Sequence, residues 1–221
     1  MDTENFVSTR QALHAVAELL LAGPAYARDA DIRLRATSGG FGVWRQPGPR
    51  VDGTDLVIGD RRIPLVGTIA SVAEAAGFAP RTLADVYADV VSTPVDAPLQ
   101  VSSDGAAELA TAFDHGDKAL LAFAPDAEAV LWPEHFDIGI SVAVEEVNYG
   151  VSPGDSFIAT PYAYVGPWKV PPGPFWTESF GAARPLSELT DVAAIVAFFR
   201  AGQAAARDSN PSGQRGETLP H

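Results

Sequence analysis

The chain contains no cysteine, no long apolar run and no basic N-terminus. Without cysteine there can be no disulfide framework, no thiolate metal site and no cysteine nucleophile. The longest apolar stretches fall far short of the roughly 20 residues that a membrane-spanning helix needs. The first six residues are acidic and polar, whereas a secretory signal has a basic start followed by an apolar run. We therefore expect a cytoplasmic protein that does not enter a membrane.

Positive charge is also scarce, since 15 Lys+Arg stand against 28 Asp+Glu and the formal net charge is −13 at pH 7. A chain this acidic repels phosphate groups, so we expect neither nucleic acid nor anionic lipid as a partner. Hydrophobic residues make up 47% and charged residues 19% of the 221 residues, which is typical of a globular protein. We expect one domain over residues 1–206. The polar segment 207–221, rich in Gly, Pro and Ser, is predicted to be a disordered tail.

The first part of the sequence has the pattern of one helix followed by a run of strands. Ser8 and Gln11 have the spacing of a capping box, and apolar residues follow at helical intervals. Gly23-Pro24 is expected to end this helix. Alternation of apolar and polar residues then predicts four strands, at 32–36, 41–45, 56–58 and 61–63.

The remainder has a run of helices, a second run of strands and a last helix. Capping signals predict three helices, at 69–77, 82–87 and 104–123. Period-two patterns predict three strands, at 129–132, 138–144 and 157–165, before a helix from about 190 to 199. The order α-ββββ-ααα-βββ-α predicts an α+β fold, with antiparallel sheet regions and segregated helices.

The densest group of ionisable residues lies in the segment Trp132-Pro133-Glu134-His135-Phe136-Asp137, where one expected strand ends and the next begins. Alternation along the second strand would place His135 and Asp137 on one face, with Glu134 in the turn. A carboxylate beside an imidazole raises the imidazole pKa and fixes its tautomer. Glu134, His135 and Asp137 are therefore candidate catalytic residues for acid–base chemistry.

Two other interpretations of this segment stay open. His135-Phe136-Asp137 matches the H-x-D half of a non-haem iron triad, which needs a second histidine further along the chain. The later histidine is His221, in the expected tail, so we assign no metal, and the sequence points to no cofactor. In the other interpretation, which the pattern slightly favours, His135 bonds a strand end and Asp137 caps a turn.

The segment Gly150-Val151-Ser152-Pro153-Gly154 has the G-x-S-x-G spacing of a nucleophile elbow. In an elbow, the residue after the serine donates its N–H to the oxyanion hole. That residue is Pro153 here, and proline has no N–H to donate. We therefore interpret the segment, together with Asp155, as a tight turn.

Aromatic residues concentrate between residues 132 and 176, which include a proline-rich loop at 166–176. Aromatic side chains on strands and loops either line a ligand cleft or fill the core beneath the loops. The candidates for the walls of a ligand pocket are Trp132, Tyr149, Tyr162, Tyr164 and Trp168.

Three motifs together resemble a family of uncharacterised, mainly actinobacterial proteins. They are Trp132-Pro133-x-His135-Phe136-Asp137, Asn148-Tyr149-Gly150-x-Ser152-x-Gly154-Asp155 and Pro161-Tyr162-x-Tyr164. The resemblance covers roughly residues 8–205. More distantly, the chain is similar to a larger bacterial domain-of-unknown-function family with a W-x-x-F-D-type strand, a Gly-Phe-x-x-Gly turn and a Pro-x-x-Tyr strand in that order. The resemblance implies an α+β fold and no particular activity.

Two classes of function fit these observations. The leading hypothesis is a small-molecule-binding or enzymatic domain, with a site formed by Glu134, His135, Asp137 and the aromatic loop. The alternative is a non-catalytic protein-interaction or structural domain, monomeric or homodimeric, that uses the same loop. The first hypothesis places His135 in a concave site. The second leaves Trp168 and Trp176 exposed on a flat patch.

Overall fold

Ten antiparallel strands form one continuous sheet in the computed structural model, which describes residues 3–88 and 90–209. The order across the sheet is β10-β9-β8-β7-β6-β1-β2-β3-β4-β5. Every pair of neighbouring strands is antiparallel, and the helices are separate from the strands in the chain order. The expected α+β class is therefore confirmed. No helix within the described residues is long and apolar enough to cross a membrane.

Two stretches of chain, the first half (residues 3–76) and the second half (residues 103–209), have the same order of elements. Each consists of a helix, a five-stranded meander and a closing helix. The first half comprises α1 (Thr3–Val16), η1 (Ala17–Ala22), α2 (Gly23–Asp29), β1 (Leu34–Thr37), β2 (Gly40–Val43), β3 (Arg50–Asp52), β4 (Asp55–Ile58), β5 (Arg61–Pro64) and α3 (Ile69–Ala76). The second half comprises α4 (Ser103–Phe123), β6 (Val130–Trp132), β7 (Asp137–Val142), β8 (Val147–Ser152), β9 (Tyr162–Pro167), β10 (Ala182–Pro185) and α5 (Val192–Ser209).

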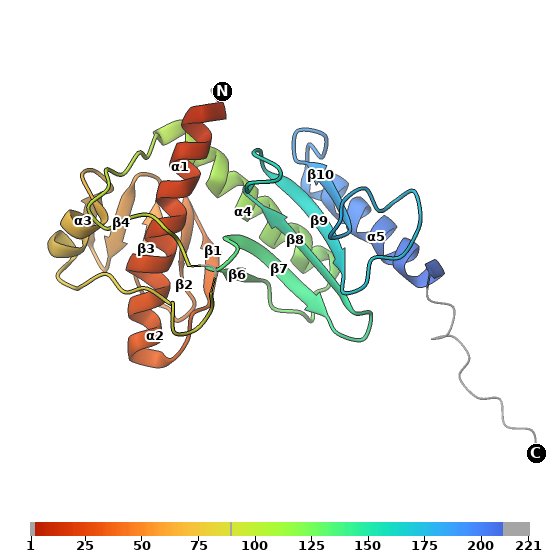
Figure 1. The fold of residues 1–221 in the computed structure, drawn as a ribbon, viewed down its shortest axis with the longest axis horizontal. Coiled ribbons are helices and arrows are strands. Elements are labelled where there is room, and N and C mark those ends of the chain that lie inside the picture. The colour runs from red at the N-terminus through yellow and green to blue at the C-terminus, as the bar shows by residue number, and fades with distance from the viewer. Residues whose placement is uncertain (1–2, 89, 210–221) are drawn as a thin grey trace, which may run out of the picture.

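The two meanders meet at the centre of the sheet, where β1 pairs antiparallel with β6 and Leu34 lies opposite Leu131. From this pair the strands run outward in chain order on both sides. The topology therefore relates the halves by an approximate two-fold axis through the central pair. In Figure 1, α1 lies in front of β1–β3, whereas α4 and α5 lie behind β7–β9. The twist that accumulates over ten strands explains why one face of the sheet is seen on the left and the other on the right.

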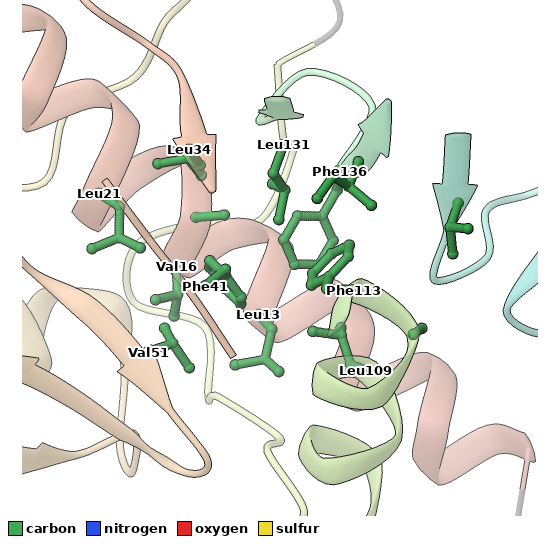
Figure 2. Close-up of a cluster of buried hydrophobic side chains, with 14 of the residues drawn as sticks. Leu13, Val16, Leu21, Leu34, Phe41, Val51, Leu109, Phe113, Leu131 and Phe136 are labelled. Atoms are coloured by element: carbon green, nitrogen blue, oxygen red, sulfur yellow. The ribbon is translucent and has the colours of Figure 1, made fainter. Parts of the chain in front are cut away.

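A single hydrophobic core joins the two halves on the helix-covered face of the sheet. Figure 2 shows side chains from α1, η1, α4 and the central strands meeting in this core. At its centre, the Phe136 ring packs edge-on against the rings of Phe41 and Phe113, with ring centroids 5.2 and 5.3 Å apart. The labelled members are Leu13, Val16, Leu21, Leu34, Phe41, Val51, Leu109, Phe113, Leu131 and Phe136.

The first helix departs from the sequence prediction at both ends. It begins at Thr3, so Ser8 lies inside it, and it continues through Gly23-Pro24 to Asp29. A π-helical turn precedes Gly23, whose N–H bonds the Glu18 carbonyl, and Pro24 follows in the first turn of α2, where its missing N–H is tolerated. Gly23 does not end the helix but allows close packing, because a Cβ there would collide with the Arg81 carbonyl.

Three strands escaped the sequence analysis. β3 has only three residues, β8 includes the first three residues (150–152) of the segment that we interpreted as a turn, and β10 ends in a proline. The segment 82–87, expected as a helix, forms turns and loop. The last helix is longer than expected, so residues 207–209 are helical and not part of a tail. The remainder of the predicted disordered tail lies outside the described residues.

Candidate functional site

A cavity of about 930 Å³ lies over β7, β8 and β9, on the face of the sheet that the helices leave uncovered. Alternation along the strands explains its floor, because every second side chain points to this face. One end of α1 and three loop segments form the walls. The lining residues used below are Arg10, His14, Glu134, His135, Asp137, Asn148, Ser152, Asp155, Phe157, Tyr162, Tyr164 and Trp168.

Six of the eight predicted site residues lie at this cavity: Glu134, His135, Asp137, Tyr162, Tyr164 and Trp168. Tyr149 and Trp132 do not line it. Tyr149 points to the opposite face of β8, where its ring packs on Phe123 and Phe199 at 4.6 and 5.8 Å. Trp132 shares the open face with Asp137, its partner across the β6–β7 pair, but lies outside the cavity.

The expectation that His135 and Asp137 share one face of a strand is wrong. β7 begins at Asp137, and His135 lies in the preceding turn. Phe136 adopts a left-handed backbone conformation (φ 52°), which directs consecutive side chains into different environments. Its own ring is buried in the core, whereas the His135 side chain is 66% exposed. The His135 imidazole lies 4.0 Å from the Glu134 carboxylate, and its described contacts include no hydrogen bond to Asp137.

The partner of Asp137 is Tyr164, whose hydroxyl donates a hydrogen bond to Asp137 Oδ2. The phenol reaches β7 from β9 by crossing two glycines, Gly150 and Gly139. A Cβ at these positions would lie 2.5 and 2.8 Å from the Tyr164 hydroxyl oxygen. The Tyr164 ring thus lies directly over Gly150, which explains a glycine in the middle of a strand.

Asp137 is buried at 8% exposure, and its Oδ1 has no hydrogen-bond partner among the described residues. Burial raises the pKa of Asp137, although the Tyr164 hydroxyl and the His135 charge act in the other direction. Burial, followed by the Asp137 charge, also raises the pKa of Tyr164 well above its usual value. Because Tyr164 donates to Oδ2, a proton on the Asp137 carboxyl belongs on Oδ1. Protonation there would leave the buried pair without net charge.

Arg10 is a site residue that the sequence analysis missed. It is only 7% exposed, and it donates to the Ala159 carbonyl at 3.0 Å and the Asp155 carbonyl at 3.3 Å. Burial lowers its pKa, and the nearby Asp155 charge opposes this shift. A signal was present in the sequence, since Arg10 lies on the same helical stripe as Phe6 and Leu13, both buried.

His14, one turn further along α1, joins the helix to the turn before β7. Its Nε2 lies 2.6 Å from the Pro133 carbonyl, so this nitrogen must carry the proton and donate. The imidazole stacks on the Phe136 ring, with centroids 4.9 Å apart and planes 2° from parallel. Burial lowers the pKa of His14 to about 4, and the positive charges of Arg10 and His135 add to the shift. The imidazole is therefore neutral at physiological pH.

The loop after β8 is built by Asp155. Its Oδ1 accepts the N–H groups of Phe157 and Ile158 at 2.7 and 2.8 Å, and its Oδ2 accepts the Tyr162 hydroxyl at 2.6 Å. Ser152 caps the same loop, because its hydroxyl oxygen accepts the Gly154 N–H at 3.1 Å. The serine of the G-x-S-x-G segment therefore shapes the wall of the cavity, in agreement with the rejection of a nucleophile elbow.

Two aromatic side chains that line the cavity are exposed to solvent. Phe157 is 83% exposed and Trp168 is 59% exposed. By contrast, Trp176 packs edge-on against Phe175 and partly against the core, so the two tryptophans of the loop do not form one flat patch. Exposed aromatic side chains at a concavity are typical of a surface that binds a partner molecule.

Within residues 3–88 and 90–209, no three His, Asp or Glu side chains are grouped so as to hold a metal ion. Comparisons of the chain with protein-family models, curated proteins and solved structures found no match.

Proposed function

We propose that the protein binds a small organic molecule in the cavity over β7, β8 and β9. The observation that carries this proposal is the combination of a volume of about 930 Å³, a floor of buried polar groups and a rim of exposed aromatic rings. Ligand sites of small molecules have volumes of roughly 300–1,000 Å³ and apolar walls with a few placed polar groups. The polar groups at this site are Arg10, Asp137 and the hydroxyl groups of Tyr162 and Tyr164.

Binding fits the geometry better than catalysis. A general acid–base pair requires the two side chains within hydrogen-bond reach of each other or of the reacting group. His135, the expected acid–base residue, is mostly exposed and lies 4.0 Å from Glu134. The His14 imidazole is held by a backbone carbonyl, and Ser152, the serine of the G-x-S-x-G segment, caps its own loop. These side chains hold the wall together, which favours a receptor or carrier of the ligand.

Native mass spectrometry of the purified full chain tests this proposal, with Asn148→Trp as the cavity-filling variant. Asn148 is exposed on β8, lines the cavity and has no hydrogen bond among the described contacts of its side chain. Thr111→Trp, on the exposed face of α4, is the control. We expect a co-purified small molecule, or a thermal shift with members of a metabolite library, in the wild type and the control but not in Asn148→Trp. If the wild type shows neither a co-purified molecule nor a thermal shift, the proposal is contradicted.

The exposure of Phe157 and Trp168, taken by itself, favours a second candidate function, which is contact with another protein. The same rim could pack on another protein or on a second copy of the chain, because apolar side chains exposed together are typical of interfaces. In that case Trp168→Ser would change the oligomeric state in analytical ultracentrifugation. Small molecules would then have no effect on thermal stability.

A further inference from the structure

We infer that the ligand of this cavity is an aromatic carboxylate, whose anionic group lies against Arg10 and whose ring covers Phe157 and Trp168. This inference rests on the proposed function and adds the chemical class of the ligand. It follows from the charges that line the cavity, from what already pairs with them, and from the position of the aromatic rim.

Arg10 is a buried cation that forms no salt bridge within the described residues, although the Asp155 charge acts on it from further away. Its guanidinium has five N–H donors, and among the described residues only two backbone carbonyls accept from it. No carboxylate of the described chain lies within ion-pair distance of it. A cation removed from water is stabilised by an anion, and a guanidinium matches the two oxygens of a carboxylate.

The acids nearest to Arg10 are committed to other partners. Both oxygens of Asp155 are occupied by the three donors that build the loop. Asp137 receives the Tyr164 hydroxyl, and its burial favours the protonated form. A protonated Asp137 carries no charge and would not repel an anionic ligand.

The wall formed by α1 and the turn before β7 carries the Arg10 guanidinium close to the His14 imidazole. The Arg10 charge acts on the buried His14 imidazole and disfavours its protonation. The exposed end of this wall carries Glu134, whose carboxylate lies 4.0 Å from the His135 imidazole. The same Arg10 charge that disfavours a proton on His14 would stabilise an anion placed near it.

The aromatic part of the ligand follows from the same loop that holds Arg10. Residues 155 and 159 supply the two carbonyls that accept from the guanidinium, and Phe157 lies between them. The anion contact and an exposed ring therefore belong to one short segment. Trp168 exposes a second ring at the same cavity. Aromatic rings in contact prefer offset or edge-to-face packing, and a planar ligand can form such contacts.

Three matched naphthalene probes test the inference: 2-naphthoate, the neutral 2-naphthamide and the cationic 2-naphthylmethylammonium. Affinities for the full chain would be measured by calorimetry and by tryptophan fluorescence. We expect 2-naphthoate to bind about tenfold or more tightly than the amide, as a charge-assisted pair provides, and the ammonium to bind most weakly. The net charge of −13 disfavours nonspecific binding of anions, so a preference for the carboxylate would report on the cavity.

Variants separate the charge from the rings. Arg10→Met is expected to lower the affinity for 2-naphthoate by about tenfold or more but to leave that for the amide almost unchanged, whereas Arg10→Lys retains part of the preference. Arg28→Met, on an exposed arginine of α2 outside the cavity, is the control for loss of one charge. Phe157→Ser, which keeps Arg10 in place, should weaken the carboxylate and the amide equally.

The outcomes distinguish this inference from the proposed function. Equal affinity of the wild type for carboxylate and amide would overturn the anionic class and leave small-molecule binding intact. If Arg10→Met lowers the affinity for 2-naphthoate and for 2-naphthamide equally, Arg10 supports the loop and does not bind the anion. That result also overturns the inference. If no probe binds, the aromatic carboxylate is wrong. The proposed function then fails as well if native mass spectrometry detects no co-purified molecule.

Discussion

The two halves of the sheet share one order of elements but differ in the face that the helices leave open. With Leu34 and Leu131 placed on the approximate two-fold axis, Gly42 of β2 corresponds to Asp137 of β7. A Cβ at Gly42 would contact the Arg50 side chain at 2.7 Å, so an arginine covers this position. In the second half the same position carries the buried carboxyl of the candidate site. Equivalent positions in the two halves therefore differ: an arginine side chain covers one, and a ligand cavity lies over the other.

The neighbouring strands continue this contrast. Arg50, the partner of Gly42, corresponds to Ser152, and Val57 corresponds to Tyr162. The open face of the first half is covered by exposed arginines that pair with Asp52 and Asp55. In the second half small and aromatic residues occupy these places, and Ser152 and Tyr162 hold the wall of a cavity.

Strand length is the second difference. β7, β8 and β9 each have six residues, whereas β2 to β5 have three or four. The additional residues extend the floor, and the connections after β8 and β9 rise above it as walls. The comparison teaches that this site arises from longer strands and longer connections on a repeated scaffold.

The largest expected effect tests whether the halves are one folding unit. Phe41 and Phe136 correspond under the two-fold relation and pack against each other across it. Replacing either by Ala should lower the free energy of unfolding by about 3–5 kcal/mol, because each deletion leaves a cavity in the shared core. Urea unfolding monitored by fluorescence and circular dichroism measures this. We expect one transition and a non-additive double variant. Two separate transitions would show that the halves fold independently.

The next effect concerns the pH dependence that His14 gives to the junction between α1 and the second half. Its pKa is lowered to about 4 from 6.5, so below pH 6.5 the unfolded chain binds a proton that the folded chain does not. The free energy of unfolding therefore contains the full His14 contribution above pH 6.5. It loses this contribution as the pH falls toward 4, by roughly 2 to 3 kcal/mol at pH 4.5.

Denaturant unfolding of the wild type and His14→Gln between pH 7.5 and 4.5 checks this prediction. The raised pKa of Asp137 acts in the opposite direction, since its folded form holds a proton that the unfolded chain releases as the pH rises. Because both proteins contain Asp137, its contribution cancels in the difference between their free energies of unfolding. His115→Gln, on α4, is the control for loss of a histidine. Parallel pH profiles of the wild type and His14→Gln would contradict the assignment.

The next effect on stability is smaller, and it compares the removal of a tyrosine hydroxyl from the open face of the second half with the removal of one from its helix-covered face. Tyr164→Phe removes the donor to Asp137 and leaves a buried carboxyl without its partner, which should lower the free energy of unfolding by about 1–3 kcal/mol. Tyr149→Phe is the matched change on the other face. Its hydroxyl bonds Glu145, which Gln203 and Arg207 also contact, so we expect a smaller loss. Thermal unfolding decides the order, and an equal loss would remove the special role of Tyr164.

The smallest expected effect is on the open face of the first half. Arg62 pairs with Asp52 and Asp55 at 2.9 and 2.8 Å, but its side chain is half exposed. Arg62→Ala should change the free energy of unfolding by about 1 kcal/mol or less, because water and salt screen exposed ion pairs. Unfolding at low and high salt measures it. A loss as large as that of Tyr164→Phe would erase the contrast between the two open faces.

Much of the fold was predictable because local signals agreed with it. The strands expected at 56–58 and 61–63 and the helices expected at 69–77 and 104–123 appear close to where their sequence patterns indicated. The missed strands had weak local signals, since β8 contains glycine and serine for reasons that lie on its neighbours. Gly150 is required by a tyrosine fourteen residues further along the chain. No periodicity within β8 could reveal that requirement.

The sequence by itself determined the α+β class, the antiparallel hairpins and the segment around Asp137 as a place to look. These depend on contacts between residues close in the chain, which a pattern records. Only the tertiary structure decided that Arg10 and His14 join this segment from α1, that Tyr149 belongs to the core, and that Asp137 pairs with Tyr164. The hydrogen bonds of Arg10, His14 and Tyr164 join residues 27 to 149 positions apart, and their energy comes from burial that forms only when distant segments of the chain pack together.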